Sequence, residues 1–384
     1  MLEKTVEILA RLISFPSISG KPNRDITNYI KSYLEGYGLE VEVSPNENAA
    51  QVNIFATIGP KISGGLILNG HTDVVPVEGQ NWRSDPFMLK KIDDRLYGRG
   101  SVDMKGFLAC VLASIPTFKS AALKRPIHLA FSYDEETGGL GMPHLLRSIS
   151  KMDYKPEIVI VGEPTEMELV TSHKGGDEMR TEIKGFEVHS CNPPKGVSAI
   201  SAAVKLISKI EGIGLRLAKS PYHDSLFDPP YSTFNIGTIR GGVARNATAG
   251  WCDFDWEFRP MPGEDNVAII SEIEEYAHDS LLPEMKAINS SAEINIITEV
   301  SAPALDDYLS SKAASFISKV TGKNSRNAVS FGTDAGYFCD AGYSAVVFGP
   351  GSIMRAHAPD EFITLKELNE GLFFLRNVAV QMST

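Results

Sequence analysis

Cysteine is scarce in this sequence, and no two cysteines stand at metal-binding spacing. The 384 residues include four cysteines, Cys110, Cys191, Cys252 and Cys339, and none belongs to a Cys-x-x-Cys motif. A disulfide framework needs a higher density of cysteines, and a thiolate zinc site needs closer spacing. The sequence therefore excludes both kinds of site and favours a reducing compartment.

Long apolar runs and an excess of basic residues are also missing. No stretch approaches the roughly 18 apolar residues of a membrane span. Residues 1–14 mix charged and apolar side chains as an amphipathic surface helix does, so they are not expected to be a signal peptide. The 48 acidic residues outnumber the 37 basic ones, for a net charge of -11. Because binding to nucleic acid or to an anionic membrane needs a basic excess, we expect a cytoplasmic protein with neither partner.

The order of predicted elements indicates two domains, one inserted into the other. At 384 residues the chain is too long for one ordinary core. Up to about residue 162, helical patterns at 27–37 and 106–119 alternate with short apolar strands, which predicts βαβ units. A helix at 305–321 and a strand ending at Phe348 resume this pattern near the C-terminus. We therefore predict an α/β fold with a mixed, mainly parallel sheet flanked by helices, formed by residues 1–174 and 300–384.

Residues 175–299 follow a different pattern, that of the predicted inserted domain. Alternating strands and two helices occur in the order β-α-β-β-α-β, which is the ferredoxin-like arrangement of a four-stranded antiparallel sheet with both helices on one face. The strands are predicted at 178–184, 232–240, 251–259 and 292–298, and the helices at 198–210 and 266–281.

Five segments of the predicted catalytic domain each place an acid or a histidine just after a short apolar run or a glycine turn. These side chains are His71 with Asp73, then Asp103, then the run Asp134-Glu135-Glu136, then Glu163, and finally His357. In open α/β sheets, ligands bind beyond the carboxyl ends of the strands, so we expect these groups to converge at one edge. Two imidazoles with several carboxylates and no thiolate suit zinc, cobalt or manganese. The pattern predicts a two-metal hydrolase.

Each of these signals also has a purely structural interpretation. His71 could be a core histidine beside a turn aspartate, Asp103 the N-cap of the following helix, Glu163 a loop residue, and residues 355–361 around His357 a polar loop. Three adjacent acids at 134–136 would be tolerated in a solvated loop, although nearby cations would make them favourable. The conjunction of five such signals in one chain favours the metal site.

The motifs resemble those of the dinuclear zinc amidohydrolase and peptidase family. That family includes acetylornithine deacetylases, succinyl-diaminopimelate desuccinylases, aminoacylases and glutamate carboxypeptidases. The resemblance covers essentially the whole chain and is carried by residues 70–76, 98–106, 134–139, 162–164 and 349–357.

This resemblance implies a role for each matching residue. Glu135 would be the general base, and Asp73 would orient His71. The family fold also implies a cis peptide between Asp103 and Met104, and a homodimer formed through the inserted domain. The implied ligands are His71, Asp103 and Glu163 for one zinc and Asp103, Glu136 and His357 for the other, with Asp103 bridging.

Within the inserted domain, residues 184–190 resemble the family segment whose histidine reaches into the partner subunit's site and supports the oxyanion. That histidine is His189 here, although Cys191 stands where serine is usual in the family. Asn246 and Arg259 match positions that hold the carboxylate of the substrate, and a guanidinium offers the bidentate geometry for it.

Among the branches of the family, the acetylornithine deacetylases fit best. Residues 348–353 before His357 resemble that branch, as does Asp334 directly after Thr333. An acid suits a substrate with a distal ammonium, so one expectation places Asp334 at the rim of the site; the alternative is that Asp334 is a turn or helix-capping aspartate. The resemblance thus implies hydrolysis of N2-acetyl-L-ornithine in arginine biosynthesis. The alternatives are a desuccinylase, a general aminoacylase, a dipeptidase or carboxypeptidase of the same chemistry, or a catalytically dead metal-binding protein.

Overall fold

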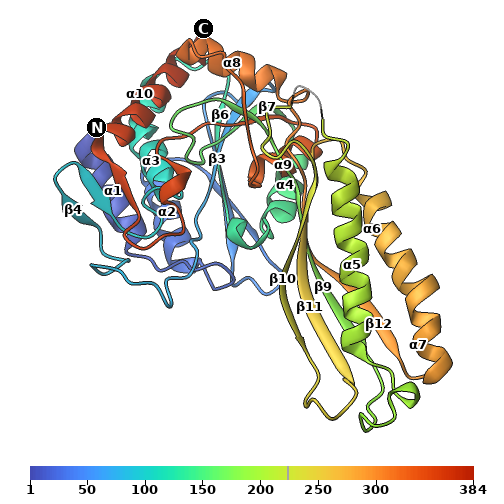
Figure 1. The fold of residues 1–384 in the computed structure, drawn as a ribbon. Helices are drawn as coiled ribbons and strands as arrows, with labels where there is room; N and C mark the ends of the chain where they lie inside the picture. The colour runs from blue at the N-terminus through green and yellow to red at the C-terminus, as the bar shows by residue number, and fades with distance from the viewer. Residues whose placement is uncertain (223–224) are drawn as a thin grey trace. The chain divides into compact units, whose positions relative to one another are not determined.

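The computed structural model describes residues 1–222 and 225–384, and the chain separates into two compact units. Unit 1 comprises Met1–His173, Leu305–Ala328 and Gly332–Thr384. Unit 2 comprises Lys174–Ala304 and Val329–Phe331. Lys174 and residues 300–304 and 329–331 thus belong to unit 2, whereas the sequence pattern places them in the catalytic domain. Figure 1 follows the chain through both units.

Unit 1 is built around an eight-stranded sheet in the order β1-β2-β6-β3-β7-β14-β8-β13. The central strands β6, β3, β7 and β14 are mutually parallel, and the pairs β1–β2, β2–β6 and β14–β8 are antiparallel. The predicted mixed, mainly parallel sheet is confirmed. Its strands are β1 (Val41–Pro45), β2 (Val52–Ile58), β3 (Gly65–His71), β6 (Ile127–Ser132), β7 (Pro156–Val161), β8 (Val170–His173), β13 (Asn327–Val329) and β14 (Ser344–Val347).

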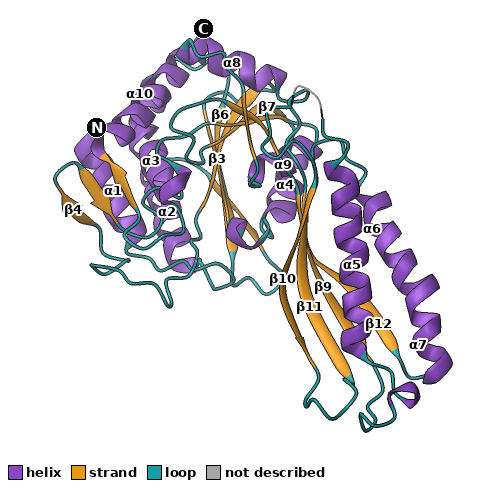
Figure 2. Cartoon of the chain, in the orientation of Figure 1, coloured by secondary structure: helices purple, strands orange, loops and turns teal. Residues whose placement is uncertain are grey.

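Helices cover both faces of this sheet (Figures 1 and 2). On one face of the sheet, alternate strand residues such as Leu66 and Leu68 share a core with a first group of helices. Because both faces are covered, the central strands read as continuous apolar runs. The first group is α1 (Leu2–Ile13), α2 (Arg24–Gly36), α3 (Lys105–Ser120), α8 (Ser311–Thr321) and α10 (Leu365–Gln381); the other face carries α4 (Met142–Ser150) and α9 (Asp334–Asp340).

A small second sheet in unit 1 joins two loops that are far apart in the sequence. Strand β5 (Arg95–Tyr97) pairs with β4 (Lys90–Ile92) on one side and with β15 (Phe362–Thr364) on the other. The loop that follows β5 therefore starts beside the loop that precedes β15. These two loops contain Asp103 and His357.

Unit 2 has the ferredoxin-like order β9-α5-β10-β11-α6-β12 along the chain, with an antiparallel sheet ordered β10-β11-β9-β12. Its helices lie on one face of the sheet, where Leu206 and Ile273 pack with Phe254 and Trp256 in one core (Figure 1). The elements are β9 (Gly176–Lys184), α5 (Ala199–Ala218), β10 (Thr233–Gly241), β11 (Trp251–Arg259), α6 (Asn266–Glu275), α7 (Leu282–Ile288) and β12 (Glu293–Ala302).

Three predicted helices differ from the structure by more than one turn at one end. The helix expected at 305–321 begins only at Ser311, because Leu305 forms a bridge with His173 and Asp306 closes a turn at Tyr308. Helix α5 continues past residue 210 to Ala218. The helix expected to end at residue 281 changes there from a π turn (Tyr276–Leu281) into α7. In the described part of the chain, no helix combines the length and the apolar character needed to cross a membrane.

Candidate metal centre

The parallel strands of unit 1 deliver the predicted ligands to one edge of the sheet. His71 is the last residue of β3, and Glu163 follows β7 by two residues. Glu135 and Glu136 form a short 3-10 turn, η1 (Glu135–Thr137), just after β6. The other two ligands come from loops: Asp103 stands two residues before α3, and His357 follows β14 and the 3-10 turn η4 (Ile353–Arg355).

Asp103 lies between the two histidines and offers one oxygen to each. Its Oδ1 is 3.0 Å from Nε2 of His71, and its Oδ2 is 3.1 Å from Nε2 of His357. On the outer sides, Nε2 of His71 is 3.4 Å from Oε1 of Glu163, and Nε2 of His357 is 2.9 Å from Oε2 of Glu136. The arrangement therefore contains two neighbouring groups of donors that share one carboxylate.

The donor separations fit divalent cations. Ligands at about 2.0–2.1 Å around a tetrahedral ion are roughly 3.3 Å apart, and the four nitrogen–oxygen distances run from 2.9 to 3.4 Å. Among the described residues, Oε1 of Glu136 is buried without a hydrogen-bond partner, as expected for an oxygen that faces an ion. Donor sets of His71 with Glu135 and Glu163, and of His71 with Asp103 and Glu136, each fall within 4.8 Å.

The pKa shifts within the cluster also indicate that positive charge would stabilise it. Burial raises the pKa of Glu135 and Glu163 well above the ordinary value, and neighbouring carboxylates raise it further. Burial together with the charge of Asp103 raises the pKa of Glu136 to about 7. Hydrogen bonds to Asp103 and Glu136 raise the pKa of His357 to about 10. Cations at this position would stabilise the ionised carboxylates, because the charge of a metal reverses the local repulsion.

Asp73 supports the cluster differently from the expectation. Nδ1 of His71 lies 2.9 Å from the backbone carbonyl of Asp73 and 3.6 Å from its carboxylate, so the carbonyl is the nearer partner of the ring. The Asp73 carboxylate instead accepts hydrogen bonds from Oγ of Ser19 and from the backbone amides of Glu135 and Glu136. Asp73 thus orients the imidazole and also anchors the turn that carries two acids of the cluster. The expected cis peptide between Asp103 and Met104 is present.

Two predicted residues of unit 2 lie side by side at one end of its sheet. His189 and Ala247 form a β-bridge, and the amide of Ser190 donates to the carbonyl of Asn246. Nδ1 of His189 accepts a hydrogen bond from the amide of Cys191, which leaves Nε2 at the exposed end of the ring. His189 and Asn246 therefore form one exposed polar patch, although they are distant in the sequence.

Arg259 lies at the opposite end of the same sheet. It is the last residue of β11, where the chain enters and leaves unit 2 at Gly176 and Ala302. Because β11 has nine residues, roughly 26 Å separates its ends at about 3.3 Å per residue. The guanidinium of Arg259 pairs with the carboxylate of Glu257 at 2.9 Å. Within one chain, a small molecule cannot contact both Arg259 and His189.

The rim position expected for Asp334 is wrong. Asp334 is the first residue of α9, its side chain is 1% exposed, and its Oδ2 accepts a hydrogen bond from Oγ of Ser132 at 2.5 Å. Thr333 is the N-cap of this helix and accepts from the amide of Ala335. Packing of α9 against β7 and β14 carries Asp334 into the interior beside Ser132, which the Gly-rich local sequence did not reveal.

Sequence reasoning assigned no role to Arg99 and Glu361, which form a fully buried ion pair at 2.7 Å. Arg99 stands inside the motif at 98–106, four residues before Asp103, and Glu361 follows His357 by four residues. One feature of the sequence could have drawn attention to Arg99, which is a charged residue between Gly98 and Gly100. Because charged side chains are rarely buried unless they are paired, a buried Arg99 would need an acidic partner.

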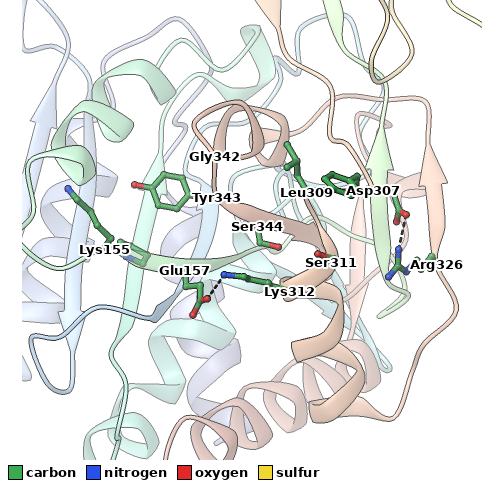
Figure 3. A pocket seen from close by; sticks show the side chains of 12 residues that line it. Lys155, Glu157, Asp307, Leu309, Ser311, Lys312, Arg326, Gly342, Tyr343 and Ser344 are labelled. Atoms are coloured by element: carbon green, nitrogen blue, oxygen red, sulfur yellow. Dashed lines mark hydrogen bonds and ion pairs between the residues drawn. The ribbon is translucent and has the colours of Figure 1, made fainter.

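A cavity of about 750 Å³ in unit 1 lies away from all these groups (Figure 3). It is lined by residues at the starts of β7 and β14, which is the edge of the sheet opposite to the strand ends that carry Glu163 and His357. Four charged side chains of its wall form two ion pairs, Lys312 with Glu157 and Arg326 with Asp307, and Lys155 donates to the carbonyl of Ser150. The cavity is therefore distinct from the candidate metal centre.

Comparison with known proteins supports the assignment of this centre. Residues 67–381 match the model of peptidase family M20/M25/M40. The chain is 32% identical to an acetylornithine deacetylase of Proteus mirabilis over 367 residues, which are 94% of this chain and 92% of that protein.

Solved structures share the fold over nearly the full length. Aminopeptidase PepT from Bacillus cereus aligns with a TM-score of 0.75 at 20% identity, covering 100% of this chain and 99% of that one. The Bacillus subtilis YXEP protein, described as a dinuclear metal-binding peptidase of the M20 family, aligns with a TM-score of 0.69 at 15% identity, covering 99% and 98%.

Proposed function

Since this chain belongs to peptidase family M20/M25/M40 and is a metal-dependent hydrolase of amide bonds, we propose that it hydrolyses N2-acetyl-L-ornithine to L-ornithine and acetate. The observation that supports the chemistry is the placement of Asp103, with one oxygen toward each histidine and Glu135 beside them. The observation that supports the substrate is the full-length similarity to a bacterial acetylornithine deacetylase. A role in arginine biosynthesis in the cytoplasm follows from this substrate. The partner is then a small molecule, not a nucleic acid or a membrane.

We assign the cluster to two divalent cations, zinc or alternatively cobalt or manganese, because the donors are imidazole nitrogens and carboxylate oxygens. Bound cations would supply Lewis acidity, which activates water and polarises the acyl carbonyl. The proposed ligands are His71, Asp103 and Glu163 for one ion and Asp103, Glu136 and His357 for the other.

Glu135 is the proposed general base. Its carboxylate would accept a proton from the attacking water and return it to the amine that leaves. Asp73 contributes by holding the backbone amides of Glu135 and Glu136 at 3.3 Å, which fixes the direction of the base.

His189 is proposed to act on the substrate bound by a partner subunit. The support comes from unit 2 itself, in which His189 and Asn246 lie about the length of β11 away from Arg259. If both ends of the sheet take part in catalysis, they act at different active sites. In a homodimer formed through unit 2, each active site would receive the Arg259 end of the sheet from one chain and the His189 end from the other. In such a site Arg259 or Asn246 would hold the substrate carboxylate, and His189 would donate to the oxyanion.

Mixed dimers test this arrangement. His189→Ala subunits and Glu135→Gln subunits should each be inactive alone. In the heterodimer, one site combines wild-type Glu135 with wild-type His189, so up to half of the activity of a wild-type site pair should return. No recovery in purified heterodimers would show that His189 acts within its own chain or has no catalytic role.

Turnover of a substrate panel tests the proposed activity. The metal-loaded protein should hydrolyse N2-acetyl-L-ornithine with a higher kcat/KM than N-succinyl-diaminopimelate, N-acetylmethionine or a dipeptide. A preference for one of the other three would reassign the protein within the same chemistry. No turnover by protein with two bound metals would mean that it only binds metal.

A further inference from the structure

Glu361 binds the backbone of the loop that carries Asp103. Its Oε1 accepts hydrogen bonds from the amides of Val102 and Asp103 at 2.9 and 3.1 Å, and its Oε2 accepts from the amide of Gly100 at 3.0 Å. The side chain is completely buried. Three amides aimed at one carboxylate make a rigid attachment, since hydrogen bonds to a charged acceptor are roughly twice as strong as neutral ones.

Arg99 extends this attachment to the loop that carries His357. Its guanidinium pairs with Glu361 at 2.7 Å and also donates to the carbonyl of Ala358 and to Oε1 of Gln80. Gln80 in turn donates from Nε2 to the carbonyl of His357 at 2.8 Å. Glu361, Arg99 and Gln80, together called the clamp, thus connect the backbone at Asp103 with the backbone at His357.

The contacts of the clamp concern one half of the metal cluster. Asp103 and His357 come from loops, and their side chains meet at 3.1 Å. His71 and Glu163, by contrast, stand at or near the ends of the central strands β3 and β7, whose pairing positions them. Loops vary in position more than strands do, so a ligand pair built on two loops has the greater need of a fixed connection.

Stability alone is a weak reason for such a pair. Replacing a buried ion pair by apolar side chains is often neutral or stabilising, because desolvation offsets the attraction of the charges. The carboxylate of Glu361 instead accepts hydrogen bonds from backbone amides of the loop that carries Asp103, which indicates that its role is to position this loop.

We propose that the clamp is a positioning device that sets the separation of Asp103 and His357, and so the affinity of the one cation site to which both contribute. This rests on the proposed two-cation centre. The clamp residues touch neither substrate nor cation; they act through the backbone of the two ligands.

Calorimetric titration of zinc or cobalt into chelator-treated protein tests the proposal without any substrate. The variants are Glu361→Gln, Arg99→Lys and Gln80→Ala. Wild type should bind two equivalents. Each variant should lose about 10- to 100-fold in the affinity of the equivalent to which Asp103 and His357 both contribute, which is the usual effect of partners behind a ligand. The other equivalent should lose less, because it shares only the bridging Asp103, and Gln80→Ala should leave it within about threefold. Gln80→Ala should give the smallest loss, because it releases only the His357 side.

Glu272→Gln is the matched control. Glu272 on α6 pairs with Lys209 and Arg216 of α5, so this variant makes the same chemical change within unit 2 and alters neither of the two ligand loops. This variant should melt at a lower temperature while binding both equivalents normally. A thermal melt of each variant separates loss of folding from loss of metal.

Equal losses of both equivalents in the clamp variants, or no loss, would overturn the proposal. If Glu361→Gln does not fold, Gln80→Ala still decides, because it removes no buried charge. Fewer than two equivalents in the wild type would refute the two-cation centre and the clamp with it. Two equivalents with no turnover of acetylornithine would refute only the proposed substrate and would leave the clamp result standing.

Discussion

Replacing Glu135 by glutamine is expected to separate catalysis from metal binding. Glu135 lies in the cluster with His71 and Glu163, one ligand atom of each falling within 4.8 Å of the others. It takes no part, however, in the four contacts of 2.9–3.4 Å that join the histidines to the other acids. Glutamine has nearly the same shape but cannot accept the proton of an attacking water.

The size of the expected effect follows from that role. Loss of a general base slows the reaction by roughly 10²- to 10⁴-fold, which at 1.36 kcal/mol per factor of ten is about 3 to 5 kcal/mol of activation free energy. KM should change little, because no proposed contact with the ground-state substrate is removed. Metal content should remain at two ions per chain, since all five proposed ligands are intact.

The assay combines metal analysis of dialysed protein with steady-state kinetics on acetylornithine. Glu157→Gln is the control, because it makes the same chemical change at the opposite edge of the sheet, where Glu157 pairs with Lys312. It should leave both kcat and metal content unchanged. Near-normal turnover by fully metallated Glu135→Gln would refute the assignment, and loss of one metal ion would make Glu135 a ligand instead.

Two further predictions concern the cluster and its surroundings. In protein stripped of metal by a chelator, burial raises the pKa of Glu136 from 4.5 to about 7, so the folded state holds a proton that the unfolded state has released. Its unfolding free energy should therefore fall as pH rises from about 5 to 7, a decline that urea denaturation should detect and that added zinc should abolish. For Asp334→Asn, the burial of the side chain against Ser132 predicts equal changes in KM for acetylornithine and N-acetylmethionine. A selective loss of about 1 to 3 kcal/mol for acetylornithine, the range for a hydrogen bond to a charged group, would instead restore a pairing with the distal ammonium.

The sequence by itself was sufficient for the architecture and for the identity of the clustered acids and histidines. Strand β3 and helix α5 follow local patterns of apolar residues, and the end of a buried strand is visible as the point where such a run stops. Since parallel strands end at one edge, the sequence pattern alone predicts that His71 and Glu163 meet. The extra turns of α5 and the late start of α8 do not follow from the pattern, because helix ends depend on contacts with other parts of the chain.

Only the tertiary structure decided which side chains support the cluster and which way they face. Glu361 and Arg99 are 262 positions apart in the chain, and no local pattern marks them as partners. The same holds for Asp334, whose local sequence suggests a rim residue but which the packing of α9 places beside Ser132. Periodicity reports how a residue lies relative to its own helix or strand, whereas pairing of loops depends on how distant elements pack. That packing is a property of the whole fold, so the partners of Asp103 and His357 could be read only from the folded chain.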